Sequence, residues 1–135
     1  MADEPPTTPH AAGPDGAPAR EATLNAQISR AIVRLLNEYT GRGPTRARTT
    51  INGDLVACLL EDTLTKGERM LVANGQENAV LRTRESYQRA MQPEAIAAIE
   101  ALTGRTVAAF MSSNHIDPDY AVEVFVLQNA SPNPI

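Results

Sequence analysis

The sequence predicts an α+β fold, a two-layer sandwich in which helices cover a four-stranded antiparallel sheet. Three observations support this class: helical spacing of apolar residues in two regions, strand-like segments at four places, and an Asn-Gly turn signal between the first two strands. The elements run helix, strand, strand, helix or helix pair, strand, strand. Moving the last strand to the front gives β-α-β-β-α-β, so we expect a circularly permuted ferredoxin-like sheet.

The first 20 residues are expected to form a disordered tail outside this domain. They contain five prolines, two glycines and no Leu, Ile, Val or Phe. Such a segment cannot bury enough apolar surface to offset the entropy of ordering it. It also lacks the basic start and apolar run of a signal peptide. The predicted domain covers residues 21–128, and residues 129–135 form a short flexible tail.

The first helix is predicted over residues 21–39. One face is apolar because large side chains recur every three or four positions: Leu24, Ile28, Ile32, Leu35 and Tyr39. Arg30 and Arg34 look outward. Gly41 can take a positive φ and end the helix, and Pro44 prevents its continuation.

Two paired strands are predicted next, at residues 46–51 and 55–60, with the Asn-Gly-Asp turn between them. Because strand side chains alternate, Arg46, Arg48 and Thr50 share one face. Cys58 lies inside the apolar second strand, which predicts a small buried side chain and not a nucleophile.

Residues 63–92 are helical in composition, with Gly67 and Gly75 interrupting the start. A helical stripe follows, formed by Val80, Arg84, Tyr87 and Met91. Thr65 and Glu68 have the spacing of a capping box. Pro93 suits the first turn of another helix, which ends at Gly104. Strands are predicted at 105–113 and 120–127, joined by the turn-rich residues 114–119.

Composition narrows the functional classes. The net charge of −4 and the pI near 5.1 argue against broad nucleic-acid binding, as does an aromatic content of 4%, since RNA-binding sheets stack bases on aromatic rings. No window approaches the roughly 18 apolar residues of a membrane span. One cysteine excludes an internal disulfide and fits a reducing compartment. We expect a cytoplasmic protein without a transmembrane segment of its own.

The stretch Y-T-G-R-G-P-T-R-A-R-T-T at residues 39–50 is the first candidate site. A phosphate loop needs its glycines after a strand and before a helix, and here the order is reversed. The guanidinium groups of Arg42, Arg46 and Arg48, together with Thr50, could instead bind an anion or an acidic partner. The alternative is that these arginines pair with acidic residues of the sheet, such as Glu61, Asp62 or Glu123.

A second candidate set consists of polar residues at strand ends and in turns: Glu61, Asp62, Lys66, Asn114, His115, Asp117 and Asp119. Histidine can bind metal or move protons near neutral pH. The spacing matches no metal motif, however, and Asp-Pro is common turn chemistry. Glu61 and Asp62 could hold a cation or cap a helix. No nucleophile and base can be paired from one ordered histidine and a buried thiol, so we predict no catalytic residue, metal or cofactor.

Four segments resemble the MpsC-like family of small bacterial domains: L-N-A-Q-I-S-R, E-Y-T-G-R-G-P-T-R-A-R-T-T-I, L-L-E-D-T-L-T-K-G-E-R and M-S-S-N-H-I-D-P-D-Y-A-V-E-V-F-V-L. They occur in order across residues 22–127. The resemblance implies association with a sodium-translocating, membrane-potential-generating system whose membrane proteins are linked to cation movement and inorganic-carbon uptake. It implies no catalytic mechanism.

Two functions are consistent with these observations. The first is a non-catalytic accessory or regulatory domain, acting as a homo-oligomer beside membrane transport proteins and recognising an acidic partner or small anion through its arginines. The alternative is an anion-sensing domain or enzyme, in which Arg42, Arg46 and Arg48 hold the anion and His115 with Asp117 transfers protons.

Overall fold

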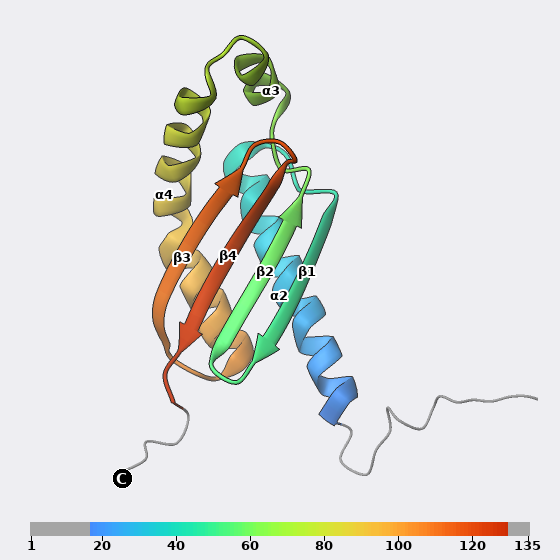
Figure 1. Ribbon diagram of the computed structural model, residues 1–135. Helices are drawn as coiled ribbons and strands as arrows, with labels where there is room; N and C mark the ends of the chain where they lie inside the picture. The colour runs from blue at the N-terminus through green and yellow to red at the C-terminus, as the bar shows by residue number, and fades with distance from the viewer. Residues whose placement is uncertain (1–16, 130–135) are drawn as a thin grey trace, which may run out of the picture.

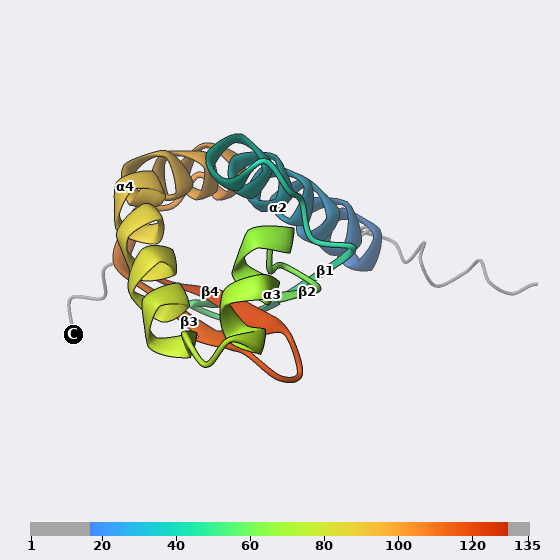
Figure 2. The ribbon, with the colours of Figure 1, turned by 90° about the horizontal axis from the view of Figure 1, so that it is seen from above.

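The computed structural model describes residues 17–129 as one antiparallel sheet with helices on one side (Figure 1). The strands are β1 (Arg46–Asn52), β2 (Leu55–Glu61), β3 (Val107–His115) and β4 (Tyr120–Leu127), in the order β1-β2-β4-β3. Helices α2 (Ala17–Thr40) and α4 (Glu77–Thr103) cover one face, and α3 (Lys66–Ala73) lies at one end (Figure 2). The predicted α+β class and element order are confirmed, and moving β4 to the front gives β-α-β-β-α-β.

The core lies between the sheet and the two long helices. Every second residue of β2 and β4 faces it, so Val56 pairs with Phe125 in register and both are fully buried. From the helices, fully buried Ile28, Ile32, Met91 and Ile99 fill the same layer. Period 2 in the strands and period 3.6 in the helices therefore place the apolar residues on one interface.

The opposite face of the sheet is not covered by any helix in the described part of the chain (Figure 1). Its central rows are apolar, with Leu59 beside Val122 and Ala57 beside Val124. At its margins Leu55 and Met111 are 44% and 51% exposed. The sheet therefore has one buried face and one accessible, largely apolar face.

The first helix begins at Ala17, four residues before its predicted start, so residues 17–20 do not belong to a disordered tail. Alanine and arginine are strong helix formers, and a proline is tolerated in the first turn, which explains the extension. The rest of the predicted N-terminal tail, residues 1–16, and residues 130–135 of the C-terminal tail lie outside the described residues. Gly41 has φ of 79°, as expected for a helix end.

The predicted capping box is confirmed at the start of α3. The Thr65 hydroxyl accepts from the Glu68 amide at 3.1 Å, and the Glu68 carboxylate accepts from the Thr65 amide at 2.8 Å. The predicted interruption at Gly67 is wrong because this residue lies inside α3, whereas Gly75, with φ of 77°, does separate α3 from α4.

The expected new helix at Pro93 is also wrong, because α4 continues through it. Proline removes one helical hydrogen bond, but Pro93 is exposed and the freed carbonyl group can reach water. Met91 and Ala95, on either side, are fully buried and hold both halves of α4 on the sheet. Figure 2 shows that α4 changes direction along its length, as a proline kink allows.

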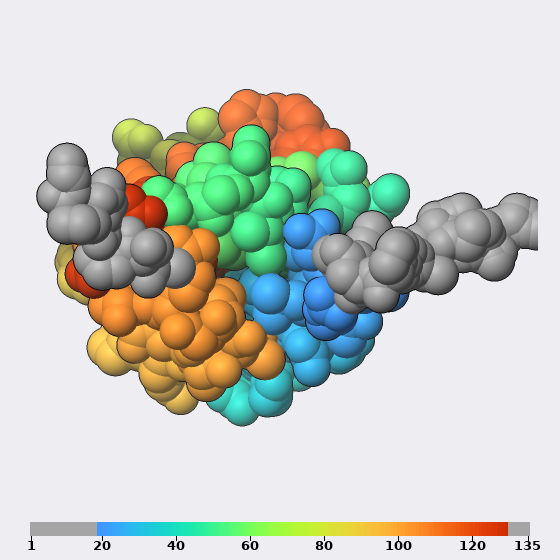
Figure 3. Space-filling model, turned by 90° about the horizontal axis from the view of Figure 1, so that it is seen from below, coloured from blue at the N-terminus to red at the C-terminus, as the bar shows by residue number. Residues whose placement is uncertain are grey.

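Strand β3 begins and ends two residues later than predicted. Asn114 and His115 therefore belong to the strand and not to the connecting turn, because they pair with Ala121 and Tyr120 of β4. Arg105 precedes the strand. Its guanidinium group donates to the Gly53 carbonyl at 3.1 Å and contacts Asp54 at 2.9 Å, so it joins the β1–β2 turn to the end of α4. Figure 3 shows the green β1–β2 turn beside the orange end of α4.

Candidate functional site

The first strand forms an edge of the sheet, and a groove runs beside it. Within residues 17–129, β1 pairs only with β2. Its other side borders a groove of about 710 Å³ between β1 and α2. Figure 2 shows that helix α2 lies over this edge. The groove is lined by Ser29, Arg30, Val33, Arg34, Asn37, Gly43 and Ala47.

The helical period explains why this side of α2 faces the groove. Ile28 and Ile32 enter the core, so Ser29 and Val33, one position later, turn toward β1. Ser29 Oγ lies 2.8 Å from Thr49 Oγ1, which joins the helix to the strand. A Cβ atom at Gly43 would lie 3.4 Å from the Val33 side chain, an ordinary van der Waals contact, so the connecting loop packs against α2 at this point.

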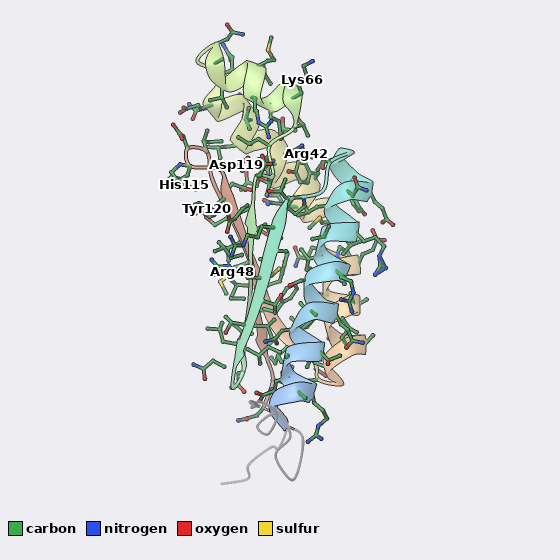
Figure 4. All side chains as sticks on the ribbon, turned by 90° about the vertical axis from the view of Figure 1, so that its right-hand side faces the viewer. Arg42, Arg48, Lys66, His115, Asp119 and Tyr120 are labelled. Carbon is green, nitrogen blue, oxygen red and sulfur yellow. The ribbon has the colours of Figure 1, made fainter. Side chains whose placement is uncertain are left out.

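Arginine side chains border this edge from both layers. Arg46 and Arg48 project from β1 on the uncovered sheet face with Thr50, as the alternation predicted (Figure 4 labels Arg48). Arg30 and Arg34 project from α2 along the groove. Arg46 Nε lies 3.9 Å from Glu61, a weak and exposed contact. We call Arg30, Arg34, Arg46 and Arg48 together the arginine-rimmed edge.

The arginine-rimmed edge is short of acidic partners. Among the described residues, no ion pair involves Arg30, Arg34 or Arg48. The chain carries 16 acidic against 12 basic residues, so this local excess of positive charge opposes the net charge of the molecule. The arrangement offers exposed guanidinium groups to an anionic partner.

Arg42 does not belong to this edge. Its guanidinium group contacts Asp62 at 2.6 Å, and Arg69 contacts the other oxygen of the same carboxylate at 2.6 Å. The hydrogen bonds from Arg69 and then Arg42 lower the pKa of Asp62. Asp62 has φ of 61°, a conformation that aspartate tolerates better than most residues, and it ends β2 there. Figure 4 shows Arg42 on the helix side of the sheet, away from Arg48.

Two of the remaining polar candidates, Asp119 and His115, make hydrogen bonds at the β3–β4 turn. Asp119 accepts from the Thr63 hydroxyl and the Leu64 amide, both at 2.9 Å. His115 Nδ1 lies 2.8 Å from the Pro118 carbonyl oxygen. Lys66 and Asp117 are exposed. In the part of the chain described, no three His, Cys, Asp or Glu side chains are placed to hold a metal ion.

The structure does not bring His115 together with the arginines. They share the uncovered face, but β1 and β3 are opposite edges of the sheet. Three strand spacings of about 4.8 Å separate them, roughly 14 Å. A small anion held by Arg46 and Arg48 is therefore beyond the reach of His115.

Two buried polar groups were not recognised as such from the sequence. Arg84 is 1% exposed and donates to Glu68 at 2.9 Å, Thr63 at 2.7 Å and Asn114 at 2.9 Å. The signal in the sequence that could have indicated its burial is its position in the apolar stripe of α4. This network joins α3, α4 and β3, and its full hydrogen bonding indicates a structural role.

The second is Glu123, which is fully buried between β3 and α4. Its carboxylate accepts from the Ser112 hydroxyl, and Gln88 Nε2 lies 3.5 Å away. Burial raises its pKa to about 7. In β4 it occupies an inward position between Ala121 and Phe125, so alternation alone could have placed it in the core. Cys58 is its register partner, and burial likewise raises the pKa of that thiol.

No helix in residues 17–129 has the length and hydropathy to cross a membrane.

No curated protein and no solved structure matches the chain. One family does match, over residues 20–129, and it is described as Na+-translocating membrane potential-generating system (MpsC). The match includes β1 and all four arginines of the arginine-rimmed edge, and it agrees with the resemblance of the four sequence segments. The chain therefore belongs to the MpsC family.

Proposed function

We propose that this protein is a non-catalytic accessory subunit that binds an acidic segment of a partner through the arginine-rimmed edge. The family name associates the chain with a Na+-translocating, membrane-potential-generating system, so the partner is a membrane protein of that system. The observation that carries the proposal is the cluster of exposed arginines, three of them without an ion pair among the described residues, beside a groove and the outer edge of β1.

Charge complementarity suits this role better than catalysis does. Exposed opposite charges attract a partner over about one Debye length and select against basic competitors. The small-anion alternative has less support, because Arg42 is engaged by Asp62 and His115 lies at the opposite edge.

Self-association, predicted from the sequence, would use the uncovered sheet face. Val122 and Val124 form its apolar centre. A Val124→Glu substitution would place a charge there and shift the sedimentation velocity of an oligomer toward that of the monomer. An unchanged sedimentation coefficient, or a monomer in the unsubstituted protein, would contradict this assignment.

The proposed function is tested in membrane vesicles from the cells that produce this protein. Replacing the native copy with the Arg46→Glu, Arg48→Glu variant is expected to lower both the vesicle-bound amount of the protein and the Na+-dependent membrane potential, measured with a voltage-sensitive dye. The matched control is Arg82→Glu, Arg89→Glu, which makes the same charge change on exposed positions of α4. Equal potentials in the two variants, at equal protein levels, would contradict the proposal.

A further inference from the structure

We propose that the acidic partner segment binds as an extended fifth strand along β1, with acidic residues at every second position and small apolar residues between them. This inference rests on the proposed function and adds the binding mode and the sequence pattern of the ligand.

The edge of β1 is suited to strand addition. β1 contains seven residues, none of them proline, and pairs with β2 in unbroken register from Arg46 to Asn52. Proteins usually protect such edges with proline, bulges or a covering segment. Here the space beside the strand is a groove with α2 above it, so an added strand would continue the sheet beneath the helix.

The two sides of that added strand would meet different surfaces. Its side chains alternate between the faces of the sheet, and it would lie about 4.8 Å from β1. On the helix side they enter the groove against Val33 and Ala47, where small apolar side chains fit. On the uncovered side they become cross-strand neighbours of Arg46 and Arg48, where carboxylates form ion pairs. Alternation of the two residue types follows from this geometry.

The helix adds a third contact. Arg30 and Arg34 are one helical turn apart on α2, and like charges at this spacing repel each other. Both line the groove. A carboxylate at the end of the bound segment would lie between them and remove the repulsion, which strengthens binding beyond that of the strand contacts.

A second copy of this chain is a poorer occupant of the edge. Antiparallel pairing of two β1 strands would place Arg46 and Arg48 of both copies on one face. In the full-length register Arg48 would oppose Thr50 of the second copy and lie diagonally across from the Arg48 of that copy, and like charges on neighbouring strands destabilise pairing. The charge of this edge therefore favours an acidic partner over self-association.

The test uses the full chain and fluorescent peptides of the same length as β1. One peptide alternates Glu with Val or Thr, and the second has the same composition with all Glu residues in one block. The third keeps the Glu residues of the first and has Pro in place of the residues between them. Fluorescence anisotropy is expected to show roughly tenfold weaker binding of the other two peptides, because the block peptide would turn carboxylates toward the groove and the proline peptide lacks backbone donors for the sheet. Arg46→Glu, Arg48→Glu should weaken binding of the alternating peptide by a similar factor, and Arg82→Glu, Arg89→Glu should not.

The outcomes separate the two proposals. Equal affinity of the alternating, block and proline peptides, all lost in the Arg46→Glu, Arg48→Glu variant, would overturn strand addition and retain acidic recognition. No binding of any peptide at low salt would overturn both. A dimer that forms through β1 and is dissociated by Arg48→Glu, observed by light scattering, would assign the edge to a second copy and overturn the partner proposed here.

Discussion

A single buried carboxyl group, Glu123, dominates the polar chemistry of the core. Its pKa is raised to about 7 because the charged form is poorly solvated between β3 and α4. The protonated form is therefore the one that folding favours. Ser112 and Gln88 provide hydrogen-bond partners for the carboxyl group in the native state, but neither carries a positive charge that could balance an ionised Glu123.

We predict that the free energy of unfolding falls as pH rises from about 4.5 to about 7. The folded pKa lies above the ordinary value, so the stabilisation is complete below about 4.5 and is lost as pH passes through the folded pKa. The loss is roughly 3 kcal/mol for a shift of this size. Urea denaturation across this pH range should show the slope of unfolding free energy against pH in the native protein and in Glu85→Gln, an exposed control. A slope that persists in Glu123→Gln would show that another group causes it.

Arg84 provides a second prediction at this scale. Replacing it with Met retains the apolar stem but leaves the buried Glu68 carboxylate without its cation. We expect a loss of about 3 kcal/mol in thermal or urea denaturation, since removing one partner of a buried pair leaves an uncompensated charge. Arg89→Met, at an exposed position of the same helix, should change stability by less than about 0.5 kcal/mol. Equal stabilities of the two variants would contradict a structural role for the network.

Residue alternation predicted many of these positions but not their partners. It placed Arg46 and Arg48 on one face because a strand has period 2, and the apolar run around Cys58 placed that residue in the core. It did not predict that Arg84 would reach Asn114, 30 residues away, whereas the pairing of Arg42 with Asp62 is one of the alternatives that the sequence left open. Such contacts depend on how elements pack in space, and sequence spacing holds no information about that distance.

At the scale of elements, local rules were reliable where a specific cap or turn exists. The Thr65–Glu68 capping box and the turn at Gly53, with φ of 63°, both formed as predicted. The helix start predicted at Pro93 is wrong because the packing of α4 on both sides of this residue outweighs the one helical hydrogen bond that proline removes. The end of β3 was misplaced because pairing with β4, a non-local interaction, extends the strand to His115.

The capping box yields a prediction for α3. Thr65→Ala removes the acceptor for the Glu68 amide, and Glu68 then loses part of the geometry that directs it toward Arg84. We expect a loss of about 1 kcal/mol of unfolding free energy, and Thr65→Ser should retain most of it. Hydrogen exchange should quicken first in α3. A loss equal in the two variants would attribute the effect to the methyl group instead of the cap.

At the scale of the whole molecule, two features cooperate. Among residues 17–129, the helices cover only one sheet face, and α2 lies over β1, which pairs there with β2 alone. The fold therefore presents an edge, a groove and four arginines in one region, while the polar turn at His115 and Asp119 stabilises the opposite edge. The sequence predicted the fold class and the shared face of Arg46 and Arg48. The groove lies between α2 and β1 and depends on how they pack together, so it could not be predicted from either element alone.

The most direct test of the arginine-rimmed edge is residue-resolved mapping of an acidic ligand. Amide NMR spectra of the isotope-labelled protein would be recorded during titration with the alternating Glu-Val peptide. We expect the shift changes to concentrate in β1 and in residues 29–37 of α2, with slowed exchange of the outward-facing β1 amides. Changes confined to α3 and the β3–β4 turn, with β1 unaffected, would contradict it.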